Sequence, residues 1–294
     1  MALALVRANP SHFPEITRII FEAFKGIQEQ HRFPVDIPTM EVAGMLAGMF
    51  LNNPNVYGVT AMLDGKIVGS NFVAIFDPVS SIGPITVDPT VQGKGVGREL
   101  MRHITEWSLR NRGPMVRLVQ EGFNMQSLSL YTSLGFTVTE PLVLMEMLPA
   151  EKADDSVRPL AASDLAACDE LCGRMIQVSR KNELAFMVEH GARGGFTPFG
   201  RFRDGKLVAY LVPGFLGHGA AESAEDLLVT AVQAARNVPP PSHRIFIPTR
   251  NGELLRRALE MKMRCMKPMS LMAMGPYEAV ISEGGGAWTP SIGY

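Results

Sequence analysis

The chain has 294 residues, of which 46% are hydrophobic and 19% are charged, and its formal net charge is −1. This length predicts two domains, and the balanced charge argues against nucleic acid or an anionic membrane as a partner, since both are bound by clustered Lys and Arg. The sequence shows no signal peptide, no membrane-length apolar run and only three cysteines, so we expect a cytoplasmic protein without a disulfide framework.

The first half of the chain alternates between strand and helix signals. Asp64-Gly65, between two strand-like runs, is the strongest hairpin signal. Residues 28–37, which contain His31, predict a loop that we place at the rim of a substrate site. The apolar periodicities predict strands at 2–6, 56–63, 66–76, 85–87 and 115–119, helices at 14–25, 38–51, 95–110 and 125–134, and a pair of strands within 136–148.

Residues 85–102, ITVDPTVQGKGVGRELMR, join a β-branched strand, a glycine-spaced loop and a helix start. Glycines lack Cβ, so backbone N–H groups can converge on an anion, and the first-turn amides and the helix dipole favour negative charge there. Lys94 and Arg98 add cationic donors. A Walker A loop would need a Lys-Ser or Lys-Thr pair at Gly97, and a dinucleotide fingerprint would need a glycine in place of Leu100. The pattern therefore predicts a pyrophosphate site on one helix N-terminus.

The second half of the chain repeats the first. Residues 63–68, LDGKIV, recur as RDGKLV at 203–208, and residues 124–147 align at a constant offset with residues 251–274. Between its hairpin and the helix that follows, the second repeat is shorter, and the glycine loop of the first repeat falls in this interval. The second repeat therefore lacks the pyrophosphate loop, and we expect it to have a structural or substrate-shaping role.

The polar residues that follow Pro149 mark the boundary between the two repeats. The predicted domains are residues 1–149, which we call the first copy, and residues 157–276, which we call the second copy. A tail of residues 277–294 completes the chain.

Two motifs of the first copy resemble the GCN5-related N-acetyltransferase (GNAT) superfamily. Residues 87–97, VDPTVQGKGVG, fit its core pattern V-x-P-x-x-Q/R-x-x-G-x-G/A without departure. Through the repeat, the whole chain is similar to tandem members of the superfamily. The second family signature has an Asn, a small residue, a Tyr and a Gly-Phe pair at set spacings, and the chain supplies Asn124, Ser127, Tyr131, Gly135 and Phe136.

The resemblance implies an α/β (α+β) fold of two tandem GNAT-like domains, each a mixed, mostly antiparallel twisted sheet flanked by helices. It implies an acyltransferase that moves an acetyl group from acetyl-CoA to a primary amine of a small molecule or peptide, by direct attack in a ternary complex. Cys168, Cys172 and Cys265 lie outside the motifs of the first copy, so a thiol relay has no support. Cys168 and Cys172 also lack further ligands at metal-binding spacing, so we expect no metal.

The resemblance also assigns roles to individual residues. Tyr131 would be the general acid that protonates the CoA thiolate, since a phenol of pKa about 10 can donate to a thiolate of pKa about 8.5–9. The residues implied to hold acetyl-CoA are Ile85, Thr86 and Val87 on a strand, Gln92, Gly93, Lys94, Gly95, Val96, Gly97 and Arg98 at the loop and helix start, and Asn124, Ser127 and Tyr131.

The general base has no motif. Some superfamily members place a Glu five residues before the Asn, where this chain has Val119. Glu121, at the end of a predicted strand, is our tentative base, with Asp77, His31 and the carboxylate of Tyr294 as alternatives. Because the expected carboxylates are missing, a CoA-responsive binding or regulatory module with weak or no catalysis is the alternative function. The acceptor, the role of the tail and the oligomeric state, a homodimer included, stay open.

Overall fold

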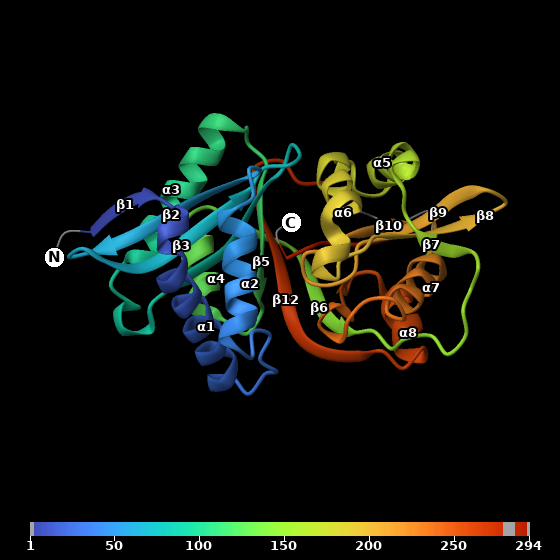
Figure 1. The fold of residues 1–294 in the computed structure, drawn as a ribbon, viewed down its shortest axis with the longest axis horizontal. Helices are drawn as coiled ribbons and strands as arrows, with labels where there is room; N and C mark the ends of the chain where they lie inside the picture. Colours follow the sequence, from blue (N-terminus) through green and yellow to red (C-terminus); the bar gives the residue numbers. More distant parts are fainter. Residues whose placement is uncertain (1–2, 279–285, 293–294) are drawn as a thin grey trace.

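The structure is a computed structural model that describes residues 3–278 and 286–292. The two copies form two lobes that lie side by side, and the long strands β6 (Thr137–Glu146) and β12 (Arg264–Met274) run through the junction between them (Figure 1). Across the described residues, no helix is both long enough and apolar enough to cross a membrane.

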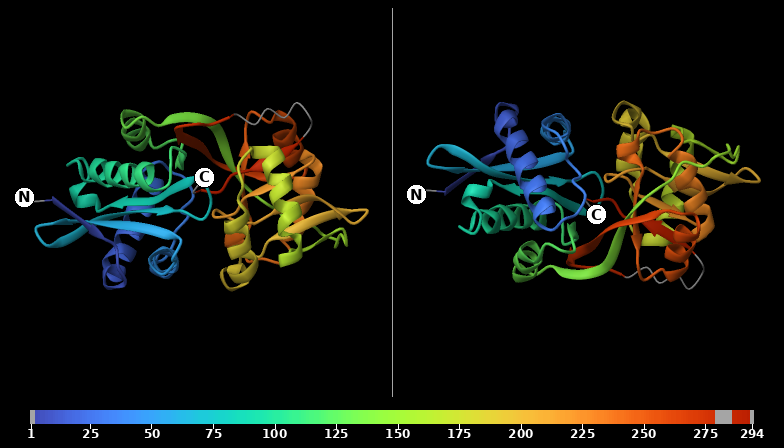
Figure 2. Two further views of the ribbon diagram at one scale, coloured as in Figure 1. Left: turned by 90° about the horizontal axis from the view of Figure 1, so that it is seen from above. Right: turned by 90° about the horizontal axis from the view of Figure 1, so that it is seen from below.

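The first copy alternates strands and helices in the predicted order. Before β6, its elements are β1 (Leu3–Arg7), α1 (Phe13–Gln30), α2 (Met40–Leu51), β2 (Val56–Leu63), β3 (Lys66–Ala74), β4 (Ser80–Val87), α3 (Val96–Asn111), β5 (Val116–Glu121) and α4 (Met125–Ser133). Neighbouring strands pair antiparallel except β4 and β5, which are parallel. Helices α1 and α2 cover one face of the sheet and α3 covers the other (Figure 2). The mixed, mostly antiparallel sheet flanked by helices is thus confirmed.

Helix α1 is longer than predicted. Past Gly26 the helix still buries a residue, the polar Gln28, and it ends at Gln30. A glycine inside a helix costs roughly 1 kcal/mol, which the packing of α1 against α2 and the sheet offsets. The loop that was predicted to begin at residue 28 therefore begins at His31.

The prediction of two strands within residues 136–148 is wrong. That segment forms the single strand β6, because its expected neighbour is replaced by β12 of the second copy. β12 lies between β5 and β6 and pairs antiparallel with both. Among the described residues, the first sheet has the order β1-β2-β3-β4-β5-β12-β6-β11, which ends with β11 (Arg244–Pro248).

The strand exchange between the copies is reciprocal. In the internal repeat, β11 is the counterpart of β5, and β12 is the counterpart of β6. The order β5-β12-β6-β11 is therefore symmetric when the two copies are exchanged. β12 lies between two strands of the first copy, and β6 lies between two strands of the second. Because β6 and β12 each have hydrogen-bonded neighbours on both sides, neither copy completes its sheet without the other.

The second copy builds a separate sheet of order β13-β10-β9-β8-β7 among the described residues. Besides β11 and β12, its elements are β7 (Val157–Pro159), α5 (Leu165–Ile176), α6 (Lys181–Gly194), β8 (Phe199–Arg203), β9 (Lys206–Leu211), β10 (Gly219–Ala221), α7 (Ala224–Ala234) and α8 (Gly252–Glu260), and the tail adds β13 (Ala287–Thr289). Along β9, Ala209 and Leu211 pack in the cluster that contains α7, whereas Tyr210 packs with α5 and α6. Helices therefore cover both faces of this sheet as well.

Backbone conformations also repeat between the copies. The two Asp-Gly dipeptides turn their hairpins with left-handed φ at both positions. After α4, Gly135 adopts a φ of 97°, and its counterpart Lys262 after α8 adopts a φ of 65°. The same left-handed helix end thus recurs although the side chain differs, so the tertiary fold imposes it on a residue that would otherwise avoid it.

Glu140 is buried where β6 pairs with β12. The residue is 3% exposed, and burial raises the pKa of Glu140 to about 6, an effect that Arg250 at 3.9 Å offsets only in part. Because the pKa of Glu140 in the folded state lies above its ordinary value of 4.5, the protonated carboxyl stabilises the folded state at pH values below about 4.5. The contribution is lost as the pH rises through about 6.

Glu140→Gln is therefore expected to raise the free energy of unfolding at neutral to alkaline pH by about 1–2 kcal/mol, since one pKa unit corresponds to roughly 1.4 kcal/mol. The gain should shrink as the pH falls from about 7 towards about 4.5, where the parent carboxyl is also neutral. Urea unfolding of parent and variant over this range measures the effect. A gain that does not change with pH would contradict the assignment.

Candidate active site

The glycine loop lies between β4 and α3. Gly93 and Gly95 have φ values of 77° and 87°, in the left-handed region that residues with side chains rarely adopt. Gly95 directly precedes α3 and offers no side chain to cap it. The N–H groups of the first helical turn, at the positive end of the helix dipole, are therefore available to an anion.

Hydrogen bonds to the Asp88 carboxylate, which were not predicted from the sequence, hold the start of this loop. Asp88 accepts hydrogen bonds from the Thr90 backbone N–H at 2.9 Å and from Arg18 Nη2 of α1 at 2.8 Å. Burial would raise the pKa of Asp88, but the hydrogen bonds from Thr90 and Arg18 outweigh it and hold that pKa below its usual value. The carboxylate therefore stays ionised and ties the loop to α1.

Strands β4 and β5 separate beside this loop. They pair at Ser80 and Ser81, opposite Val116 and Arg117, and the later part of β4 pairs with β3 on its other side. Among the described residues, no strand pairs with the other edge of residues 85–87, which we call the free edge of β4, and all three residues line a cavity between the copies. Such an edge can form backbone hydrogen bonds with an extended ligand.

Helix α4 carries the second set of predicted residues. Asn124 caps it, since its Oδ1 accepts a 3.0 Å hydrogen bond from the Ser127 backbone N–H. Tyr131 lies one helical turn after Ser127 and is 6% exposed. Burial raises the pKa of Tyr131 to about 12, a hydrogen bond with Ser127 lowers it in part, and the charge of Glu121 raises it again. The phenol is therefore a protonated donor at neutral pH.

Glu121 belongs to a group of paired charges at the base of the cavity. Its Oε1 accepts hydrogen bonds from Lys267 Nζ and Gln28 Nε2, both at 2.6 Å. Lys267 also pairs with Asp36, which accepts from Arg244 Nη1 at 2.6 Å and from Gln28 at 2.7 Å. We call these five residues the charged cluster. Two carboxylates face two cations, so the buried charges are balanced.

Most of the charged cluster was not predicted, because its members come from α1, the following loop, β5, β11 and β12. One signal was available in the sequence. Lys267, Met269 and Leu271 alternate along β12 and are all buried, so Lys267 occupies an inward-facing position of an otherwise apolar strand. A lysine at such a position needs a buried anionic partner.

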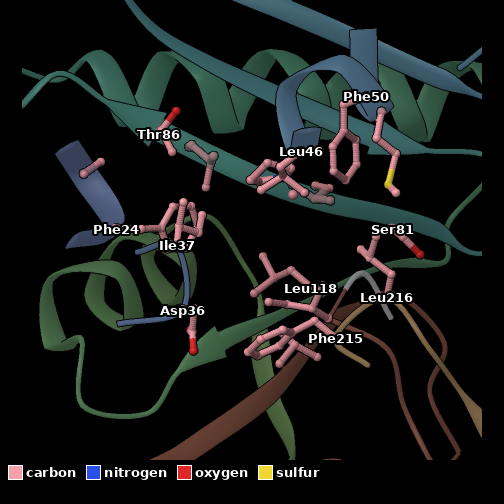
Figure 3. Close-up of a pocket in the computed structure, with 18 of the residues that line it drawn as sticks. Phe24, Asp36, Ile37, Leu46, Phe50, Ser81, Thr86, Leu118, Phe215 and Leu216 are labelled. Carbon is pink, nitrogen blue, oxygen red and sulfur yellow. The ribbon is translucent and has the colours of Figure 1, made fainter. Parts of the chain in front are cut away.

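The cavity has a volume of about 1040 Å³ and receives side chains from both copies. Figure 3 shows Thr86 and Leu118 of the first sheet on its walls, together with Phe215 of the second copy. Its volume is at the upper end of the range of roughly 300–1,000 Å³ for small-molecule sites. It therefore has room for part of a long ligand and for a second molecule.

The predicted cofactor residues fall into two groups. Lys94, Gly95 and Arg98 lie in the exposed loop and at the helix start, outside the cavity lining. The others line the cavity, and they are Ile85, Thr86, Val87, Gln92, Gly93, Val96, Gly97, Asn124, Ser127 and Tyr131.

The candidate bases are placed differently from one another. Glu121 lines the cavity, whereas Asp77 accepts hydrogen bonds from the backbone N–H groups at the start of α6 and joins the two copies there. Burial raises the pKa of Asp77, although those two hydrogen bonds work against it. His31 is exposed, and its Nδ1 forms a hydrogen bond with the Ile27 carbonyl. Tyr294 lies outside the described residues.

The three thiols lie away from the cavity lining. Cys168 and Cys172 are buried on α5, and Cys265 is exposed on β12; all three are free. Burial raises the pKa of Cys168 to about 12, so this thiol is not activated. In the part of the chain that the structure describes, no group of three or more His, Cys, Asp or Glu side chains is placed to hold a metal ion.

In the second copy, the chain's own tail covers the edge that is free in the first. β10 is the counterpart of residues 85–87, because the two segments pair with β9 and β3 in the same register. β13 pairs antiparallel with the other edge of β10, with Trp288 opposite Ala220, and it also contacts β11. Trp288 is 4% exposed. The groove between β10 and β11 is therefore filled.

The side chain of Asn251 also holds the tail in this groove. Asn251 is the counterpart of Asn124 and caps α8 through a 3.0 Å hydrogen bond from the Leu254 backbone N–H. Its amide nitrogen donates to the Gly286 carbonyl at 3.4 Å. The tail is thus held by a strand edge on one side and by the capping Asn on the other.

After β13, the tail crosses to the cavity. The Ile292 carbonyl accepts a hydrogen bond from the Val119 N–H of β5 at 3.2 Å, and the Ile292 N–H donates to the Phe215 carbonyl at 2.7 Å. Ser291 and Ile292 line the cavity. The tail therefore connects the filled groove of the second copy with the open cavity beside the first.

Two solved structures share this fold over almost the whole length of the chain. A putative acetyltransferase from Pyrococcus horikoshii superposes with a TM-score of 0.68 at 19% identity, over 95% of this chain and 92% of that one. A tandem GNAT protein from the clavulanic acid biosynthesis pathway superposes with a TM-score of 0.60 at 12% identity, over 94% and 100% of the two chains. At these identities, the likeness shows the fold.

The family model of the acetyltransferase (GNAT) family matches residues 14–136, so the chain contains a GNAT-family domain. The mycothiol acetyltransferase of Thermomonospora curvata is 39% identical over 93 residues, which are 31% of this chain and 28% of that protein. The mycothiol acetyltransferase of Tsukamurella paurometabola is 32% identical over 97 residues, or 32% and 33% of the two chains. The matched segment thus spans at most a third of the length of these relatives.

Lys267→Met is expected to lower the free energy of unfolding by about 3–5 kcal/mol, because it leaves the Asp36 and Glu121 carboxylates buried with one cation fewer. The double variant Lys267→Met/Glu121→Gln should recover part of the loss. Lys206→Met is the matched control, since Lys206 is exposed on β9. Guanidinium unfolding gives the three values. An effect of Lys267→Met as small as that of the control would show that the cluster is not desolvated.

Proposed function

We propose that this protein is an N-acetyltransferase that uses acetyl-CoA and moves the acetyl group to a primary amine of a small molecule or peptide. One observation carries the proposal: a single cavity brings together the free β4 edge, the start of α3, the buried phenol of Tyr131 and the carboxylate of Glu121. The GNAT-family domain and the relatives named mycothiol acetyltransferases support acetyl transfer to an amine.

The second copy supports the cofactor assignment by analogy within the chain. There, the extended backbone of the tail is held by β10 and by Asn251. The pantetheine arm of acetyl-CoA is likewise extended and carries amides, so residues 85–87 and Asn124 are suited to hold it in the first copy. We place the pyrophosphate at residues 92–98, with Lys94 and Arg98 as cationic donors. Ser127 and Tyr131 complete this side of the site.

Tyr131 is the proposed general acid. Acetyl-CoA supplies an acyl group activated as a thioester, and its breakdown requires a proton at the leaving sulfur. With a pKa of about 12, the buried Tyr131 phenol holds its proton throughout the neutral range and can donate it as the C–S bond breaks. Packing against Phe136 keeps the ring in place.

Glu121 is the proposed base for the acceptor. The amine nitrogen forms the new bond to the acetyl carbon and must release a proton to a group within hydrogen-bond reach. The hydrogen bonds from Lys267 and Gln28 converge on Oε1 of Glu121. We therefore assign Oε2 as the proton acceptor, with Lys267 and Gln28 orienting the carboxylate. No thiol takes part, so the acetyl group passes directly from cofactor to amine in a ternary complex.

The second copy, residues 157–276, has a structural and substrate-shaping role in this proposal. Only two residues, Glu222 and Ser223, connect β10 to α7, where the first copy has its glycine loop. Ala258 stands in the place of Tyr131 and is fully buried. Because β13 fills the groove as well, we propose that each chain binds one acetyl-CoA.

Tyr131→Phe is expected to lower kcat by roughly 10²- to 10⁴-fold, the usual contribution of a general acid. The KM for acetyl-CoA should change little, because the ring and its packing remain. The parent should show no alkaline loss of activity from this group below about pH 12. Tyr57→Phe is the control, since Tyr57 stacks on Trp107 outside the cavity lining. Thiol release with a panel of amines measures the effect, and a parent-like kcat in Tyr131→Phe would refute the role.

Isothermal titration should give one acetyl-CoA bound per chain. Gly95→Asp should abolish binding, because it places a carboxylate and a strained left-handed residue at the pyrophosphate loop. Gly205→Asp is matched in strain, since Gly205 has a φ of 75° in an open hairpin turn, and it should keep the affinity of the parent. Two cofactors per chain, or retained binding in Gly95→Asp, would contradict the proposed site.

A further inference from the structure

The part of the cavity that faces α2 is apolar, although it lies between two lobes rather than inside a core. Figure 3 shows Phe24, Leu46 and Phe50 from the first copy opposite Phe215 and Leu216 from the second. These five side chains are half-buried and can be reached from the cavity. Apolar surface of this kind, gathered in a concave site, marks the place of an apolar ligand.

Helix α2 has apolar side chains on the face that borders the cavity as well as on the face that packs in the core. Its sequence, MEVAGMLAGMFL, has one charged residue. Ala43 and Ala47 pack fully buried in the core, whereas Met45 on another side of the helix is 62% exposed and borders the cavity, as Met49 does. A helix of a soluble protein that is apolar on two faces buries both. Since the second copy stands across the cavity from α2, a small molecule inside the cavity suits this face better than a protein partner.

The buried ion pairs of this cavity lie beside the proposed base. The charged cluster lies at its base, next to the proposed base Glu121, and each carboxylate there is already paired with a cation. The cluster can therefore orient one amine close to Glu121, but it has no net charge to hold a strongly ionic body. Outside the cluster, the lining combines the apolar side chains of α2, Phe215 and Leu216 with polar side chains of α6, namely Glu183, His190 and Arg193.

We infer that the acceptor is a primary amine carried on a bulky apolar body, which lies between α2 and Phe215 while the amine points to Glu121. This inference rests on the proposed function and adds the substrate class. Met45 and Met49 have flexible thioether side chains, so the site accommodates apolar bodies of more than one shape. The second copy thereby forms one wall of the acceptor site through Phe215 and Leu216.

The test compares amines of equal basicity and increasing apolar length. With butylamine, hexylamine and octylamine, kcat/KM should rise about fourfold per buried methylene. Glucosamine, a polar and less basic primary amine, should be acetylated poorly when kcat/KM is referred to the concentration of free amine. A kcat/KM that is flat along the alkylamine series, or higher for glucosamine than for octylamine, overturns the inference.

Two variants locate the effect. Met45→Gln and Met49→Gln keep the length of the side chain but add a polar amide to the lining, so kcat/KM for octylamine should fall about tenfold while that for butylamine changes little. The KM for acetyl-CoA should stay at the parent value. Met40→Gln is the matched control, since Met40 is on the same helix, is 45% exposed and lies outside the cavity lining. Equal losses in all three variants would place the apolar body elsewhere.

The outcomes separate this inference from the proposed function. If glucosamine is acetylated efficiently and the alkylamines are not, the proposed function stands and the apolar acceptor is rejected. If acetyl-CoA binds but no amine of either kind is acetylated, the proposed function fails and the inference fails with it. A product titration gives a second readout that needs no turnover: N-acetyl-octylamine should bind Met49→Gln about tenfold more weakly than the parent.

Discussion

The antiparallel pairing of β6 with β12 is the interaction on which the rest of the structure depends. Each strand lies between two strands of the other copy, so the pairing sets how the two lobes face one another. The cavity exists because the lobes are held in this way. The same exchange carries Lys267 on β12 to Asp36 and Glu121 of the first copy, where it balances two buried carboxylates. A strand contributed by one copy thus completes the electrostatics of the other.

The equivalent grooves of the two copies differ in what lies in them. In the first copy the edge of β4 is free and a glycine loop leads into α3. In the second copy β13 covers the corresponding edge, and Asn251 donates to the tail. Backbone hydrogen bonding along an extended segment is common to both situations, so the same scaffold can accept either a ligand or its own chain. The proposed division of labour between the copies follows from this difference.

Burial separates the chemistry within the cavity. Tyr131 lies among apolar side chains, which favour its neutral form and keep it a proton donor. Glu121 lines the same cavity, but its Oε1 accepts hydrogen bonds from Lys267 and Gln28. The proposed acid and the proposed base thus lie in contrasting environments, a buried apolar one for Tyr131 and a hydrogen-bonded, charged one for Glu121.

The local sequence determined what depends on neighbouring residues. The Asp-Gly hairpins, the helical stripes, the glycine loop before α3 and the internal repeat all follow from patterns within the sequence. Tertiary structure alone decided the rest. Residues 136–148 carry strand signals but no signal that names a partner, so the place of β12 beside β6 was not predicted. The charged cluster escaped prediction for the same reason, because Asp36 and Lys267 are far apart in the sequence and meet only through the strand exchange.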